Sequence, residues 1–140
     1  MNQNKFELEV EAKLDSLPVI GDFIAETVER FGADPATVYK VQLAVDEACT
    51  NIALYAYSGQ KGSIKLACGL VDSDFVVTIR DKGKPFDPLS VPIPDLKADL
   101  DSRKVGGLGI YFMRKLMDVV SYSFDANNGN QLTMRKRLTE

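Results

Sequence analysis

The chain has 140 residues, of which 45% are hydrophobic and 26% charged; this is typical of one globular domain and excludes a disordered or fibrous protein. Its 17 Lys and Arg residues against 20 Asp and Glu residues give a net charge of −3, so no overall basic character favours nucleic acid or an anionic membrane as a partner. Histidine is absent, which excludes Ser-His-Asp and Cys-His catalysis and leaves carboxylates, Lys, Tyr or water for proton transfer.

The N-terminal half predicts one strand and two helices. Apolar residues alternate with Glu over residues 6–12, which is the period of a strand with one wet face. A first helix is predicted from Pro18 to Gly32, because apolar residues recur there at helical spacing. A longer helix is predicted to begin at Asp34-Pro35 and to run toward Ser58-Gly59.

A hairpin and a long loop are predicted next. Residues 63–70 and 75–80 are rich in strand-forming residues and are separated by a short polar turn, which predicts an antiparallel hairpin. Four prolines then exclude regular structure, so residues up to Val105 are expected to form a long loop, with one short helical turn at residues 96–100. A loop of this length in a small domain is typically functional or disordered.

The C-terminal part predicts a helix and a second hairpin. The helix follows the glycines at residues 106–109, and strands are predicted over residues 119–124 and 131–138 around an Asn-Asn-Gly turn. Together the elements predict a single domain over residues 1–140 of the α+β class. The expected architecture is a two-layer sandwich with helices on one face of a mixed, mostly antiparallel sheet.

The remaining general features concern location and thiols. No apolar run approaches the roughly 18 residues that span a bilayer, and the N-terminal residues lack the apolar centre of a signal peptide, so a cytoplasmic location is expected. The two cysteines, Cys49 and Cys68, form neither a disulfide framework nor a four-ligand metal site. We interpret both as buried apolar residues.

Glu47 and Asn51 form the first candidate site. They stand four positions apart on the predicted long helix and therefore share one face. A carboxylate can accept a proton from an attacking hydroxyl, and a neutral amide oxygen can bind Mg²⁺ without overcharging a phosphate site. An exposed helix face with a solvated Glu-Asn pair accounts for the same residues.

Asp81 and Gly83 form the second candidate site, at the end of a predicted strand. A buried carboxylate accepts hydrogen bonds and so suits an exocyclic amino group such as that of adenine, while a glycine lets the backbone approach the ring. Such a site would prefer adenine to guanine. An ordinary Asp-x-Gly turn after a strand is the alternative.

The glycines at residues 106–109, which open a predicted helix, form the third candidate site. Glycines there leave backbone N–H groups free to face an anion, and a helix N-terminus adds about half a positive charge. Neither a P-loop nor a dinucleotide-binding motif is present. The basic residues Arg103 and Lys104 stand just before the glycines and could balance phosphate charge, or they could simply be solvated.

The order and spacing of the three sites resemble a known superfamily. Residues 43–51 resemble the N box of the GHKL ATPases, Asp81-x-Gly83 their G1 box, and Gly107-Leu108-Gly109 their G2 box. The short length, the phrase Pro85-Phe86-Asp87-Pro88 and the ending from Gly129 to Leu138 most resemble the anti-sigma-factor serine/threonine kinases. The likeness covers nearly the whole chain, from residue 6 to residue 138.

The resemblance implies a Bergerat ATP-binding fold with a mobile ATP lid at about residues 86–105. By position, Glu47 would be the general base and Asn51 would hold Mg²⁺. Asp81 would bind the adenine amino group and Gly83 would lie under the base. The residues implied at the phosphates are Lys104, Gly107, Leu108 and Gly109.

The resemblance also implies partners. Family members phosphorylate a Ser or Thr of a STAS-domain antagonist protein, many sequester a sigma factor, and they are commonly homodimers. Pro85 replaces the second glycine of many G1 boxes, and Asn130 stands where Thr is frequent near the adenine carboxylate. Asn130 is accordingly included among the residues expected to contact ATP.

Two other functions fit the same residues. One is a nucleotide-gated binding module that holds ATP and captures a partner without chemistry; Glu47 favours the enzyme, since binding alone needs no base. The other is the detached ATP domain of a histidine kinase. It is disfavoured because the chain has neither a histidine nor a predicted pair of dimerisation helices.

Overall fold

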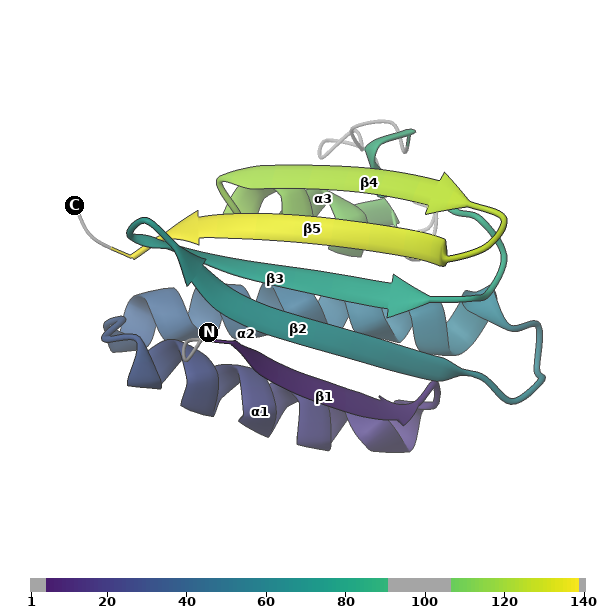
Figure 1. The fold of residues 1–140 in the computed structure, drawn as a ribbon, viewed down its shortest axis with the longest axis horizontal. Coiled ribbons are helices and arrows are strands. Elements are labelled where there is room, and N and C mark those ends of the chain that lie inside the picture. The colour runs from purple at the N-terminus through teal and green to yellow at the C-terminus, as the bar shows by residue number, and fades with distance from the viewer. Residues whose placement is uncertain (1–4, 91–106, 139–140) are drawn as a thin grey trace.

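The computed structural model describes residues 5–90 and 107–138, which form helices on one face of a single sheet. Five strands follow the order β1-β2-β3-β5-β4, and all four neighbouring pairs are antiparallel. Figure 1 shows α1, α2 and α3 behind this sheet. The predicted α+β sandwich is therefore confirmed, and within the described residues the sheet contains only antiparallel pairs.

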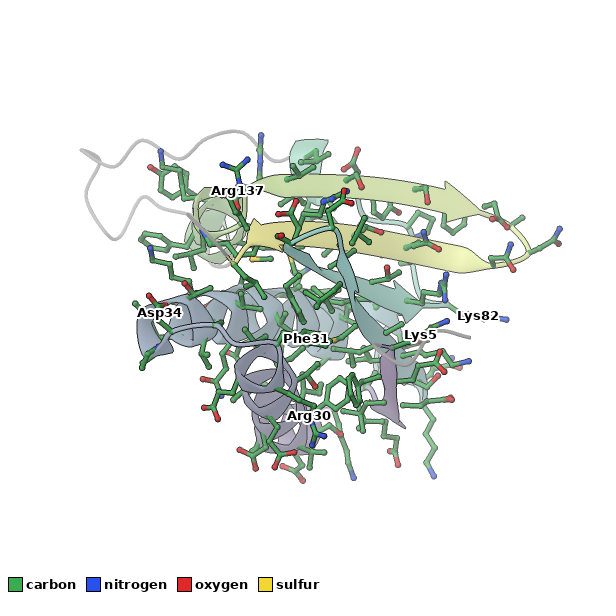
Figure 2. The ribbon with its side chains drawn as sticks, turned by 60° about the vertical axis from the view of Figure 1, so that its left-hand side comes forward. Lys5, Arg30, Phe31, Asp34, Lys82 and Arg137 are labelled. Carbon is green, nitrogen blue, oxygen red and sulfur yellow. The ribbon has the colours of Figure 1, made fainter. Side chains whose placement is uncertain are left out.

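The first strand and helix follow the predicted pattern. Strand β1, Phe6–Glu11, alternates half-buried apolar residues with exposed glutamates. Helix α1, Leu17–Arg30, has a proline in its first turn and is followed by Gly32 at φ +92°, a conformation that favours glycine. Phe31 then packs against aromatic rings of β1 and β3, and Figure 2 shows it between the helices and the sheet.

Helix α2, Pro35–Asn51, begins where the sequence predicts. The Asp34 carboxylate accepts a hydrogen bond of 2.8 Å from the Thr37 N–H, which caps the helix. The α-helical hydrogen bonding ends at Asn51, and one π-helical turn, Ile52–Ala56, continues the chain. The helix predicted to run toward Ser58-Gly59 thus has an α-helical and a π-helical part. Single π-helical turns frequently occur at functional sites.

The two hairpins account for four of the five strands. Strands β2, Ser63–Val71, and β3, Asp74–Asp81, are joined by a two-residue turn. Strands β4, Val119–Asp125, and β5, Gly129–Arg137, form the second hairpin. Strand β4 ends one residue later than predicted, whereas β5 begins two residues earlier and ends one residue earlier. Both predicted hairpins are confirmed.

The core lies between the sheet and the helices, and the third helix, α3, Gly107–Leu116, packs against α2. The most deeply buried large side chains are Ile20, Ile24, Val28, Val41, Val45, Ile64, Leu66, Phe75, Val77, Ile79, Met113 and Met134. Each contributes about 1.5–3 kcal/mol through burial. Both cysteines are free and buried, as predicted.

A short 3₁₀ turn, Pro88–Ser90, ends the first described part of the chain. The predicted helical turn at residues 96–100 and most of the predicted lid lie outside the described residues. Among the described helices, none is both long and apolar enough to cross a bilayer.

Candidate functional site

The end of β3 carries a buried carboxylate. Asp81 continues the inward-facing alternation of β3 after Val77 and Ile79, and only 7% of its surface is exposed. It pairs with Ile64 on β2 and with Asn130 on β5. Because a buried charge is costly without partners, the contacts of this carboxylate decide its state.

Two N–H groups hold one oxygen of Asp81. The Gly83 N–H donates to Oδ1 at 2.8 Å, and Nδ2 of Asn130 donates to the same oxygen at 3.0 Å. Oδ2 accepts no hydrogen bond from the described residues. Burial raises the pKa of Asp81, while the hydrogen bonds from Gly83 and then Asn130 oppose this shift. The carboxylate therefore has one anchored oxygen and one oxygen available to a donor.

Asn130 is itself buried, with 5% of its surface exposed, and its side chain joins several segments. Besides Asp81, Nδ2 donates to the carbonyl oxygens of Gly83 and Lys84, each at 3.2 Å. Oδ1 accepts from the Tyr122 hydroxyl and, at 3.4 Å, from the Phe86 N–H. Asn130 thus links β5, β4 and the segment after β3.

The structure assigns Gly83 a close contact that the sequence motif did not predict. A Cβ atom at this position would lie 2.3 Å from the Ala56 carbonyl oxygen, far inside contact distance. The next residue, Lys84, donates its N–H to the same oxygen at 2.6 Å. The π-helical turn after α2 therefore packs directly on the Asp81-x-Gly83 loop. At this end of the molecule the C-terminal ends of α2 and β3 lie near the β4–β5 turn (Figure 1).

A tyrosine reinforces the same loop. The Tyr57 hydroxyl donates to the Ser63 carbonyl oxygen at 2.6 Å and accepts from the Lys82 N–H at 2.8 Å. Figure 2 shows Lys82 and Asp34 toward opposite ends of the molecule. Sequence reasoning missed both Tyr57 and Tyr122. Tyr122 has the inward-facing alternation of its strand as a signal, but no motif distinguishes it from a core residue.

Glu47 and Asn51 lie one turn apart on α2, as predicted, and both are half-buried. Burial raises the pKa of Glu47, and the negative charge of Asp46 raises it further. A raised pKa makes a carboxylate a better proton acceptor while it is ionised. The alternative interpretation was an exposed, solvated Glu-Asn pair. It does not hold, because both side chains are half-buried.

A buried cysteine connects this helix with the carboxylate of β3. Burial is the main cause of the raised pKa of the Cys49 thiol, and the charges of Asp46 and Asp81 add to it. The Cys49 thiol is therefore close enough to both Asp46 and Asp81 for their charges to raise its pKa. Burial also raises the pKa of Cys68, to about 12, so both thiols are inert at neutral pH.

The glycine motif stands where the sequence predicts it, at the start of a helix. Gly107, Leu108 and Gly109 are the first three residues of α3, whose N-terminus presents backbone N–H groups. Helix α3, which begins with the glycine motif, packs against α2, which carries Glu47 and Asn51. Lys104 and Arg103 lie outside the described residues.

One side chain of α2 is of the kind that can hold a nucleotide-bound magnesium ion. Residues 5–90 and 107–138 hold no group of three or more His, Cys, Asp or Glu side chains that could bind a metal by themselves. Mg²⁺ commonly takes one or two protein oxygens and completes its shell with phosphate and water. The half-buried amide of Asn51 offers one such oxygen beside Glu47.

Comparisons with known proteins identify the family to which the chain is similar. The family described as "Histidine kinase-like ATPase domain" matches residues 10–136. The chain is 28% identical over 125 residues to proteins named serine-protein kinase RsbW, which include those of Bacillus thuringiensis (strain Al Hakam), Bacillus cereus (strain 03BB102) and Bacillus anthracis (strain A0248). The alignment with the first two covers 86% of this chain and 78% of each relative.

A solved structure shares the fold. The crystal structure of the RsbU and RsbW domains of Rv1364c from Mycobacterium tuberculosis matches with a TM-score of 0.70 over 97% of this chain. The sequence identity is 17%, so this likeness concerns the fold alone, and the match covers 33% of the solved chain.

Proposed function

This chain belongs to the histidine kinase-like ATPase family, and we propose that it is an ATP-dependent protein serine/threonine kinase that acts as an anti-sigma factor. It would phosphorylate a STAS-domain anti-anti-sigma protein and sequester a sigma factor. The observation that carries the nucleotide part is the buried Asp81 carboxylate, with Oδ1 anchored and Oδ2 available. The similarity to RsbW serine-protein kinases supports the kinase part.

We assign nucleotide binding to three segments. Asp81 would accept the adenine amino group, with Gly83 under the base and Asn130 beside the carboxylate. The backbone of Gly107, Leu108 and Gly109 would wrap the phosphates, with Lys104 balancing their charge. The helix N-terminus of α3 suits this role because its N–H groups and dipole favour an anion. Residues 86–105 would form the ATP lid of a single domain over residues 1–140.

Glu47 would act as the general base. It would take the proton of the substrate hydroxyl as that oxygen bonds to the γ-phosphorus, while the bond from the γ-phosphorus to the β,γ-bridging oxygen breaks and ADP leaves. Asn51 would hold Mg²⁺, which when bound neutralises phosphate charge. The raised pKa of Glu47 and its place one turn before Asn51 support this assignment.

The expected homodimer, the STAS-domain and sigma-factor partners and the cytoplasmic location belong to the same proposal. A second candidate is a nucleotide-gated binding module without phosphotransfer. The carboxylate of Glu47 favours the kinase, because binding ATP requires no base with a raised pKa.

Two measurements test the proposal. Calorimetric titration should show ATP binding that is tighter than GTP binding and stronger with Mg²⁺. Incubation with γ-³²P-labelled ATP and candidate STAS-domain proteins should then label a Ser or Thr of one of them. Binding of ATP without labelling of any STAS-domain protein would favour the binding module, and a chain that ignores ATP would refute both candidates.

A further inference from the structure

We propose that Asn130 and Tyr122 form a positioning pair, which fixes the orientation of the Asp81 carboxylate and thereby sets the preference for a 6-aminopurine nucleotide. This inference deepens the proposed function and rests on it. It gives Asn130 an indirect role, through Asp81, in place of the direct ATP contact expected from its position in the sequence.

The amide of Asn130 is fully used by the protein. Its two N–H hydrogens serve three acceptors, which are Asp81 Oδ1 and the carbonyl oxygens of Gly83 and Lys84. Its Oδ1 accepts from the Tyr122 hydroxyl and the Phe86 N–H. No N–H remains to donate to a nucleotide, so the side chain acts on its protein neighbours.

The same contacts determine which way the amide faces. If Nδ2 and Oδ1 exchanged places, an oxygen would face the three acceptors at Asp81, Gly83 and Lys84. At the opposite end the Phe86 N–H can only donate and therefore requires an oxygen there, to which the Tyr122 hydroxyl also donates. Burial raises the pKa of Tyr122, which keeps this hydroxyl protonated at neutral pH.

A fixed amide produces an asymmetric carboxylate. Oδ1 of Asp81 accepts from both Gly83 and Asn130, so Oδ2 is the oxygen left to recognise a ligand. An ionised carboxylate oxygen accepts hydrogen bonds and attracts the 6-amino group of adenine, whereas it repels the 6-keto oxygen of guanine. Without Asn130, the carboxylate could rotate or protonate and lose this discrimination.

The pair also holds the chain that leaves the site. The Phe86 N–H donates to the Tyr122 hydroxyl at 3.2 Å as well as to Asn130. The carbonyl oxygens of Gly83 and Lys84 accept hydrogen bonds from Asn130 as well. The loop is therefore tied to β4 and β5 at three residues. Loss of Tyr122 is therefore expected to loosen the amide without removing it.

The test compares ATP with purine riboside 5′-triphosphate, which lacks the 6-amino group. Calorimetry would give the Kd for purine riboside 5′-triphosphate divided by the Kd for ATP. This ratio would be measured for the wild type, for Asn130→Ala and for Tyr122→Phe, all as the full chain. We expect Asn130→Ala to reduce the ratio by roughly tenfold or more and Tyr122→Phe to reduce it less, the scale of one charge-assisted hydrogen bond. Asn128→Ala is the matched control, because Asn128 lies exposed in the same hairpin and contacts Asp125 instead.

The readout separates positioning from folding. A purely structural role would weaken both nucleotides equally and leave the ratio unchanged, which would overturn the inference. If circular dichroism shows that Asn130→Ala does not fold, an unchanged ratio in Tyr122→Phe overturns it in the same way. A wild-type chain that binds the two nucleotides equally would refute the proposed adenine site itself, so the two failures are distinguishable.

Discussion

Gly83 packs so closely against Ala56 that a Cβ atom on Gly83 would lie 2.3 Å from the Ala56 carbonyl oxygen. This contact joins the end of the helix that carries Glu47 and Asn51 to the loop that follows Asp81. The hydrogen bond from Lys84 to the same carbonyl reinforces it. Two of the three candidate sites are therefore mechanically connected.

Replacing Gly83 by Ala should destabilise the protein. The added methyl group meets backbone atoms, which cannot move aside as a flexible side chain can, so we expect a loss of about 1–3 kcal/mol in the free energy of unfolding. Urea titration followed by circular dichroism measures this loss. Gly21→Ala is the control, since its methyl group would meet only the flexible end of Gln42, at 3.3 Å, within α1. Equal stability of the Gly83 variant and the wild type would contradict the contact.

Replacing Glu47 by Ala should separate binding from chemistry. We expect ATP affinity to be kept and phosphate transfer to fall by about 10²–10⁴-fold, the usual contribution of a general base. Initial rates with γ-³²P-labelled ATP and a STAS-domain substrate, beside calorimetric Kd values, give both quantities. Glu26→Ala, an exposed site on α1, is the matched control. Transfer at the normal rate by the Glu47 variant would show that the base is another group.

The Asp46→Asn variant should shift the pH dependence of transfer. Glu47 must be ionised to accept a proton, so the rate falls as the pH drops through its pKa, which burial and the charge of Asp46 raise. Removing that charge lowers the pKa of Glu47, and transfer should persist to lower pH than in the wild type. Rates measured from below the ordinary pKa of a glutamate up to neutral pH would show the shift of the acid limb.

Asp22→Asn, on the exposed face of α1, serves as the control for this profile. It removes the same charge from the chain without changing the surroundings of Glu47. A profile that moves equally in both variants would reflect net charge and not the Asp46–Glu47 pair. A shift of the Asp46 variant toward higher pH would contradict the sign argued from the structure.

Replacing Asp81 by Asn should abolish tight ATP binding. The amide would keep an oxygen near Gly83 and Asn130 but could present N–H groups to the adenine amino group, so a donor would face a donor. We expect at least roughly a tenfold loss of ATP affinity, the scale of one hydrogen bond to a charged group. Calorimetry measures it, with Asp72→Asn in the β2–β3 turn as the control. Unchanged affinity would remove Asp81 from the site.

The local elements could be predicted from the sequence because their signals are local. The alternation in β1, the cap at Asp34 and the turn before Gly129 each depend on residues within a few positions. The position of Glu47 relative to Asn51 follows in the same way from helical spacing alone. The motifs that suggested a nucleotide site are of this kind, and the family match agrees with them.

The contacts that shape the site could not be predicted, because they join residues far apart in the chain. Asn130 meets Asp81 across 49 positions, and Tyr57 reaches the Lys82 N–H across 25. The sequence motif indicated that Gly83 was needed for a ligand, whereas the structure shows that Ala56 also requires it. The sequence by itself determined the elements and the candidate residues through short-range periodicity and capping. Only the tertiary structure decided which oxygen of Asp81 is available, because register and burial bring its distant partners together.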